Sequence, residues 1–155
     1  MLDLYEEFKR VIETLDREAI PYALVGGLAV AYHAQPRATQ DMDFLLLPED
    51  WQRCAAALLP LGFEELGEPL LLAQGTLTLH RLVKIEEDGS DVLVADFLLV
   101  DHPTLWEVWG ERQAVAWEAA VPLWVVSKSG LIRLKRLRGS KQDLADIEAL
   151  EGGPP

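Results

Sequence analysis

Residues 22–47 read YALVGGLAVAYHAQPRATQDMDFLLL, a segment in which a glycine pair ends one short apolar run and two aspartates open the next. Aspartate is disfavoured in strands, and two carboxylates on one face of a strand repel each other unless a positive charge lies beside them. The two aspartates therefore either mark the boundary of a loop or hold a cation.

The glycine pair lies between two short apolar segments. Residues 22–25 are too few for a helix and predict a buried strand, whereas 28–34 are rich in alanine and predict a short helix. Gly26 and Gly27 at this junction would let the backbone turn tightly and approach a ligand closely. The N–H groups at the start of the helix would suit a phosphate, although a glycine after a strand is more often only a turn.

The aspartates Asp41 and Asp43 lie two residues apart at the start of a strand expected over 42–47. In an extended segment both side chains point to the same side. Mg²⁺ commonly binds one or two carboxylates together with waters and substrate phosphates. The pair thus indicates a metal site, unless Asp41 only begins the strand and Asp43 is solvated.

A third carboxylate, Asp96, lies within DVLVADFLLV, the most apolar strand expected in the chain. Burial of an unpaired carboxylate is costly, so such a residue should be paired, coordinated or protonated. If this strand lies beside 42–47, Asp96 points at the same ion. If it lies at an edge of the sheet, Asp96 reaches water.

The remaining pattern mixes helices with strands, which favours an α/β (α+β) class in which helices pack on a mixed sheet. Apolar spacing, caps and turn signals predict further helices over 3–18, 49–59, 127–138 and 142–151 and within 102–112, and further strands over 76–83 and 92–100 and within 114–127. We expect one domain over 1–151 and a disordered tail over 152–155.

The composition restricts the partners. The net charge of −12 should repel nucleic acid over most of the surface. No apolar run is long enough to span a bilayer, the N-terminal segment is unlike a secretory signal, and one cysteine allows no internal disulfide, so we expect a cytoplasmic protein without a membrane partner. A basic stretch either meets phosphates or is a solvated helix face; it contains Lys128, Arg133, Lys135, Arg136, Arg138 and Lys141.

Three short motifs occur together in this chain: VGG at 25–27, DMDF at 41–44 and ADF at 95–97. In this combination the chain resembles the nucleotidyltransferase superfamily related to DNA polymerase β. The segment PRATQDMDFLL looks like its small prokaryotic members, the minimal nucleotidyltransferase and AbiEii types. The C-terminal SKSGLIRLKRLRGSKQDLADIEAL is also similar, so the resemblance extends from Tyr22 to about Leu150.

The resemblance implies transfer of a nucleoside monophosphate from a nucleoside triphosphate to a hydroxyl acceptor, with pyrophosphate released. It implies two Mg²⁺ ions, held by Asp41 and Asp43 and, at the second site, by Asp96. It also implies residues that bind the nucleotide, namely Gly26, Gly27, Arg37, Thr39 and Lys135. A solvent-exposed role for Lys135 stays open, and Asp143 and Asp146 on the last helix are expected to be exposed.

The resemblance leaves the acceptor open among a small antibiotic, the end of a tRNA and a protein hydroxyl. Longer members of the superfamily carry a further helical domain, for which we expect no counterpart in this chain, so its acceptor site would be open, shared across a homodimer or absent. Two alternatives to an active enzyme remain. One is a component of a toxin–antitoxin pair, as an antitoxin or as a toxin that acts on tRNA. The other is a nucleotide-binding module without catalysis.

Overall fold

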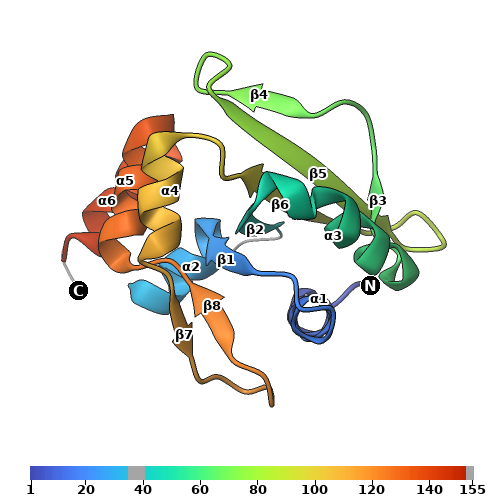
Figure 1. Cartoon of the computed structure of the whole chain (residues 1–155). Coiled ribbons are helices and arrows are strands. Elements are labelled where there is room, and N and C mark those ends of the chain that lie inside the picture. The colour runs from blue at the N-terminus through green and yellow to red at the C-terminus, as the bar shows by residue number, and fades with distance from the viewer. Residues whose placement is uncertain (35–40, 153–155) are drawn as a thin grey trace.

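The computed structural model describes residues 1–34 and 41–152, and these form one mixed sheet with helices packed on it (Figure 1). The predicted fold class is confirmed. The strands run in the order β3-β5-β6-β2-β1-β8-β7, and β4 pairs with β5 on the side away from β6, next to β3. Only β2–β6 and β1–β8 are parallel among the described pairs. The strands are β1 (Tyr22–Val25), β2 (Asp41–Leu46), β3 (Glu64–Glu65), β4 (Leu70–Leu72), β5 (Leu77–Ile85), β6 (Val92–Leu99), β7 (Gln113–Val115) and β8 (Leu123–Val125).

The described helices follow the predicted ones closely because their caps are local in sequence. Asp3 accepts hydrogen bonds from the first turn of α1, and Ser127 does so for α5. None of these helices combines the length and hydropathy needed to cross a membrane. The helices are α1 (Leu4–Arg17), α2 (Gly26–His33), α3 (Trp51–Leu58), α4 (Pro103–Gly110), α5 (Lys128–Arg138) and α6 (Lys141–Leu150).

Some element boundaries differ from the predictions, and two strands were missed. Helix α2 begins at Gly26 instead of Leu28, because the positive φ of Gly26 (69°) makes the turn out of β1 within a single residue. The strands β3 and β4 were missed, since neither is long enough to show alternation of polar and apolar residues. Of the tail predicted over 152–155, only Gly152 falls among the described residues.

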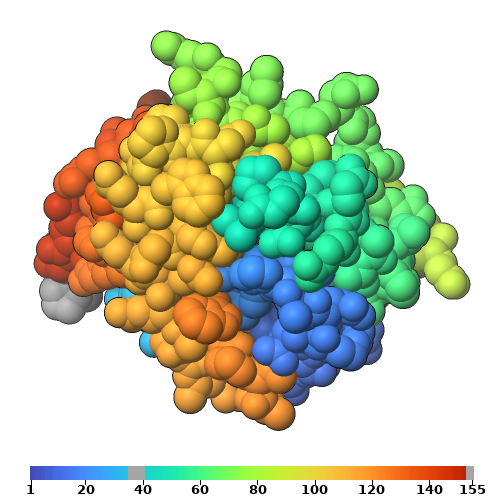
Figure 2. All heavy atoms as spheres, in the orientation of Figure 1, coloured from blue at the N-terminus to red at the C-terminus, as the bar shows by residue number. Residues whose placement is uncertain are grey.

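One face of the sheet is aromatic. Phe44 on β2 stacks on Phe97 of β6 with ring centroids 5.1 Å apart, and Phe8 of α1 lies 6.2 Å from Phe44. Trp51, at the start of α3, lies 5.8 Å from Phe97. Helices α1 and α3 therefore cover this face, and they lie side by side in Figure 2. Because alternate residues of a strand point to opposite sides, the neighbours of these phenylalanines point to the other face.

The other face carries a second group of helices. α5 packs against both α4 and α6, and the three lie together at one side of the sheet (Figure 1). Leu131 and Leu134 of α5 are buried in the core. The β4–β5 hairpin projects beyond the body of the molecule (Figures 1 and 2), so the sheet between this hairpin and α5–α6 is left partly uncovered.

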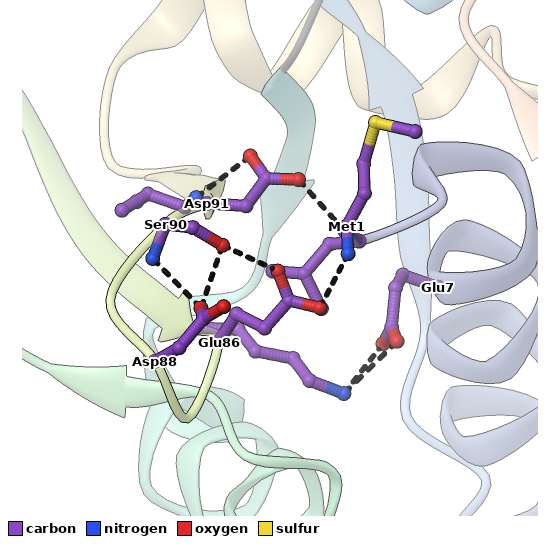
Figure 3. A network of polar contacts seen from close by, with 9 residues as sticks. Met1, Glu7, Glu86, Asp88, Ser90 and Asp91 are labelled. Atoms are coloured by element: carbon purple, nitrogen blue, oxygen red, sulfur yellow. Dashed lines mark hydrogen bonds and ion pairs between the residues drawn. The ribbon is translucent and has the colours of Figure 1, made fainter.

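The start of the chain is attached to the β5–β6 hairpin by polar contacts (Figure 3). The terminal amino group of Met1 pairs with Glu86, and the N–H of Leu2 donates to Asp91 at 2.7 Å. Glu7 on α1 accepts from the Lys84 ammonium with both oxygens at 2.9 Å, and both side chains are largely buried. These contacts hold α1 against the sheet.

We expect Glu7→Ala to lower the free energy of unfolding by about 1–3 kcal/mol, because it leaves the Lys84 ammonium largely buried without its partner. Glu13→Ala on the same helix removes an exposed glutamate and should change stability by less than about 0.5 kcal/mol. Urea unfolding of both variants measures the difference. Equal stabilities would contradict the role given to the Glu7–Lys84 pair.

Candidate active site

The three predicted carboxylates lie on one face of two neighbouring strands. β2 pairs with β6 in parallel, which meets the condition set for Asp96 to face the other two carboxylates, and Asp43 lies directly opposite Asp96. Asp41 lies opposite Val94 and points to the same side, because it is two residues from Asp43. This is the face opposite the aromatic one. The pleat of the sheet thus brings together Asp41, Asp43 and Asp96, which stand far apart in the sequence.

The predicted glycine Gly26 lies directly against one of these carboxylates. Val25, the last residue of β1, is opposite Asp43, so the chain turns into α2 beside the Asp43 side chain. A Cβ atom added to Gly26 would lie only 2.3 Å from Oδ2 of Asp43. Glycine is therefore required here for two reasons, the positive φ of 69° and the close approach.

The carboxylates line a cleft with a volume of about 480 Å³, a size typical of small-molecule sites. Its floor is the sheet, and one wall is the β4–β5 hairpin, which contributes leucines. The opposite wall comes from α5 and α6 and is polar. The lining residues are Gly26, Gly27, Asp41, Asp43, Leu70, Leu72, Leu79, Arg81, Asp96, Lys135, Arg138, Ser140, Gln142, Asp143 and Asp146.

The proton affinity of the carboxylates is perturbed. Desolvation, followed by the charges of Asp96 and Asp41, raises the pKa of Asp43 to about 7. Desolvation also raises the pKa of Asp41, and the charge of Asp96 adds to it, while Arg81 opposes the shift. Such a cluster costs free energy when it is ionised, and a bound cation would remove that cost.

Arg81 is a site residue that the sequence analysis missed. It lies on β5 opposite Asp96 and donates from Nε to Oδ1 at 2.8 Å and from Nη2 to Oδ2 at 3.0 Å. Alternation in TLTLHRLV places Arg81 on one face with Leu79 and Val83, but only the pairing of β5 with β6 shows that this face carries Asp96. That pairing joins residues separated by a hairpin, and no local signal gives its register.

Lys135 lines the cleft, but its ammonium is already held by acids. The residue is 5% exposed, and Nζ lies 2.9 Å from Oδ2 of Asp146 and 3.5 Å from Oδ1 of Asp143. The expectation that Asp143 and Asp146 are exposed is wrong, since each is only 3% exposed. Helix α6 turns back along α5, so its acids meet the lysine. Although burial opposes it, the hydrogen bond from Ser140 and the charges of Arg138 and Lys135 lower the pKa of Asp143.

The basic stretch forms ion pairs within the protein. Arg133 contacts Glu107 at 2.9 Å and Glu111 at 2.8 Å, and Arg136 contacts Glu151 at 3.0 Å. The paired cations of the stretch lie against acids of the same chain, and whether the stretch meets phosphates stays a prediction. Their charges are thereby matched before any ligand binds.

Two predicted nucleotide-binding residues, Arg37 and Thr39, lie outside the described residues. Gly27 lines the cleft beside Gly26. Their roles in nucleotide binding, and that of Lys135, stay predictions.

The chemistry of the donor set fits Mg²⁺ at Asp41 and Asp43, since both carboxylates point to the same side of β2 and Asp43 is desolvated against the Gly26 backbone. Within 1–34 and 41–152, however, no group of three or more His, Cys, Asp or Glu side chains is arranged to hold one ion. Both oxygens of Asp96 accept from Arg81. The metal role of Asp96 and the number of ions therefore stay predictions.

Comparison with solved structures identifies the fold. The antibiotic-resistance factor ANT(2'')-Ia matches with a TM-score of 0.64 and 15% identity, over 94% of this chain and 80% of its own. TM1012 from Thermotoga maritima, a candidate nucleotidyltransferase, matches with a TM-score of 0.63 and 11% identity, over 89% and 88%. This chain has the nucleotidyltransferase fold. The lincosamide antibiotic adenylyltransferase LnuA also shares the nucleotidyltransferase fold, with a TM-score of 0.55 and 13% identity over 95% and 96%.

No protein-family model matches the chain, and no curated protein sequence does either. The identities to the solved structures are low, so the likeness concerns the fold. The function must be argued from the residues that this nucleotidyltransferase fold gathers in the cleft.

Proposed function

We propose that the protein is a Mg²⁺-dependent nucleotidyltransferase that moves a nucleoside monophosphate from a nucleoside triphosphate to the hydroxyl of a small acceptor, with release of pyrophosphate. One observation carries the proposal. Asp41, Asp43 and Asp96 meet on one face of two adjacent strands, beside the Gly26 turn and within an open cleft. Carboxylates gathered in this way, against a glycine that excludes any side chain, favour metal-assisted phosphate chemistry.

In this proposal Asp41 and Asp43 hold Mg²⁺, and Asp96 lies where it can join them. The bound metal supplies positive charge that stabilises the attacking and leaving oxygens of an in-line displacement at the α-phosphate. Asp43 must lose its proton to bind the metal, so its raised pKa makes metal binding dependent on pH near neutrality. Gly26 and Gly27 let the triphosphate approach the backbone at the start of α2.

The nature of the acceptor is suggested by the structural neighbours. One structure of ANT(2'')-Ia contains adenylyl-2''-tobramycin, and that of LnuA contains lincomycin. For this chain we propose a small hydroxyl-bearing acceptor and ATP as the first donor to test. The net charge of −12 disfavours a strongly anionic acceptor. The predicted homodimer and the toxin or antitoxin partner stay predictions.

The test is transfer of label from each α-labelled nucleoside triphosphate to a panel of small hydroxyl compounds and to cell extract. We expect labelled product only with Mg²⁺, and none with Asp41→Asn although that variant stays folded by circular dichroism. Asp101→Asn, an exposed aspartate outside the cleft, is the matched control and should keep full activity. Product that is formed equally by Asp41→Asn would contradict the assignment.

A further inference from the structure

Arg81 holds the third carboxylate of the site through a paired contact. Both oxygens of Asp96 accept from it, at 2.8 and 3.0 Å, and the two residues lie directly opposite each other on antiparallel strands. Asp96 is 5% exposed. The register of β5 on β6 places Arg81 beside Asp96. Among the described residues Arg81 is the cation that pairs with Asp96.

The same guanidinium remains accessible to a ligand. An arginine has five N–H donors, and the contact with Asp96 uses one from Nε and one from Nη2. The Arg81 side chain is 44% exposed and lines the cleft. Its remaining donors can therefore meet an anion that enters the cleft, and arginine binds phosphate with the same two-pronged geometry that it uses for carboxylate.

The other described cations of the cleft are placed differently. Lys135 is buried between Asp143 and Asp146 on α6. Arg138 is half-exposed and lies 3.6 Å from Asp143, on the wall away from the sheet. Arg81 alone among these three pairs with one of the carboxylates predicted to bind metal. A ligand that attracts Arg81 would thus act directly on Asp96.

We propose that Arg81 exchanges partners: a nucleotide polyphosphate takes its guanidinium, and Asp96 is thereby released to bind a divalent cation. This rests on the proposed function and adds an order of events, in which the third carboxylate becomes available when the nucleotide arrives. A phosphate chain carries more negative charge than one carboxylate, so it competes well for the guanidinium. The released Asp96 faces Asp43, and the cation offsets their repulsion.

The exchange predicts two opposite effects of Arg81→Gln, both measured as binding. Inorganic tripolyphosphate in the presence of Mg²⁺ should bind about 10- to 100-fold more weakly, because a charge-assisted contact is lost. Mn²⁺ in the absence of any phosphate should bind about tenfold more tightly, because Asp96 is no longer held and affinity rises with ligand charge. A role of Arg81 in orienting Asp96 alone would weaken Mn²⁺ binding instead.

Arg133→Gln is the matched control, since it removes one arginine and its ion pairs outside the cleft and should leave both affinities unchanged. Arg81→Lys keeps the positive charge beside Asp96 but loses the planar guanidinium that can bind two oxygens at once. It should keep the affinity for Mn²⁺ and weaken that for tripolyphosphate about tenfold. If Arg81→Gln does not fold, this lysine variant carries the test.

Unchanged tripolyphosphate affinity in the Arg81 variants, or absence of tripolyphosphate binding to the wild type, would overturn the exchange. Weaker Mn²⁺ binding by Arg81→Gln would also overturn it. These binding measurements test the exchange alone, whereas the proposed function is tested by the transfer of label. A protein that transfers label but lacks both shifts contradicts only the exchange, and one with both shifts that transfers nothing contradicts only the enzyme.

Discussion

Asp43→Asn will abolish nucleotide transfer and will stabilise the metal-free protein at pH 8. Transfer should fall by about a thousandfold or more, because the substitution removes a negatively charged metal ligand. The gain in stability has a separate cause. Asp43 is desolvated and faces two other carboxylates, so its ionised form costs free energy that a neutral amide of the same shape avoids.

The pH dependence follows from the direction of the shift. Folding raises the pKa of Asp43 from 3.8 to about 7, so between these values the folded chain keeps a proton that the unfolded chain has lost. The contribution of Asp43 to stability therefore falls as the pH rises through this window, and it is constant above the folded pKa. The total is at most about 4 kcal/mol, from about 1.4 kcal/mol for each unit of pKa.

Thermal unfolding in a chelating buffer from pH 4 to pH 9 measures this effect. The melting temperatures of Asp43→Asn and wild type should be similar at pH 4 and should separate by about 5 °C or more at pH 8. Asp101→Asn, outside the cleft, should follow the wild type throughout. Parallel curves for Asp43→Asn and wild type would show that Asp43 is not strained by its surroundings.

Gly26→Ala should also destroy the site, for a steric reason. The new methyl group would lie 2.3 Å from Oδ2 of Asp43, and φ at this position is 69°. Asp43 cannot move away without leaving β2, where it is paired with both Val25 and Asp96. We expect loss of Mg²⁺-dependent nucleotide binding together with destabilisation by about 3 kcal/mol or more.

Gly89→Ala in the β5–β6 hairpin separates the effect of backbone strain from the effect of the close contact with Asp43. Gly89 has φ of 73° with no atom within 4 Å of an added Cβ, so alanine there reports backbone strain alone. That strain should cost about 1–2 kcal/mol and should leave nucleotide binding intact. Chemical unfolding and nucleotide titration of both variants give the comparison. If the two variants behave alike, the contact between Gly26 and Asp43 has no special importance.

The sequence predicted the parts of the site that depend on local spacing. Asp41 and Asp43 share a face because strands alternate, and Asp96 is notable because it interrupts an apolar strand. Their adjacency could be stated only as a condition, that 92–100 lies beside 42–47, and the parallel pairing of β2 with β6 meets that condition.

The residues that were missed or misplaced depend on contacts between distant segments. Arg81 reaches Asp96 only through the register of β5 on β6, and a shift of one residue would turn it to the aromatic face. Lys135 appeared to be one of several helix cations, and its burial depends on how α6 folds back to bring Asp143 and Asp146 against it. Neither the strand register nor this helix packing has a signature in a short stretch of sequence.

The most direct test of the proposed site is calorimetric titration of the purified protein with ATP, GTP, CTP and UTP, each with and without Mg²⁺. The Asp41→Asn/Asp43→Asn variant is titrated in parallel, after circular dichroism has shown that it is folded. The account predicts binding of at least one nucleotide that requires Mg²⁺ and that the variant loses. Binding that is independent of Mg²⁺, or that survives in the variant, or no binding to the folded wild type, would contradict it.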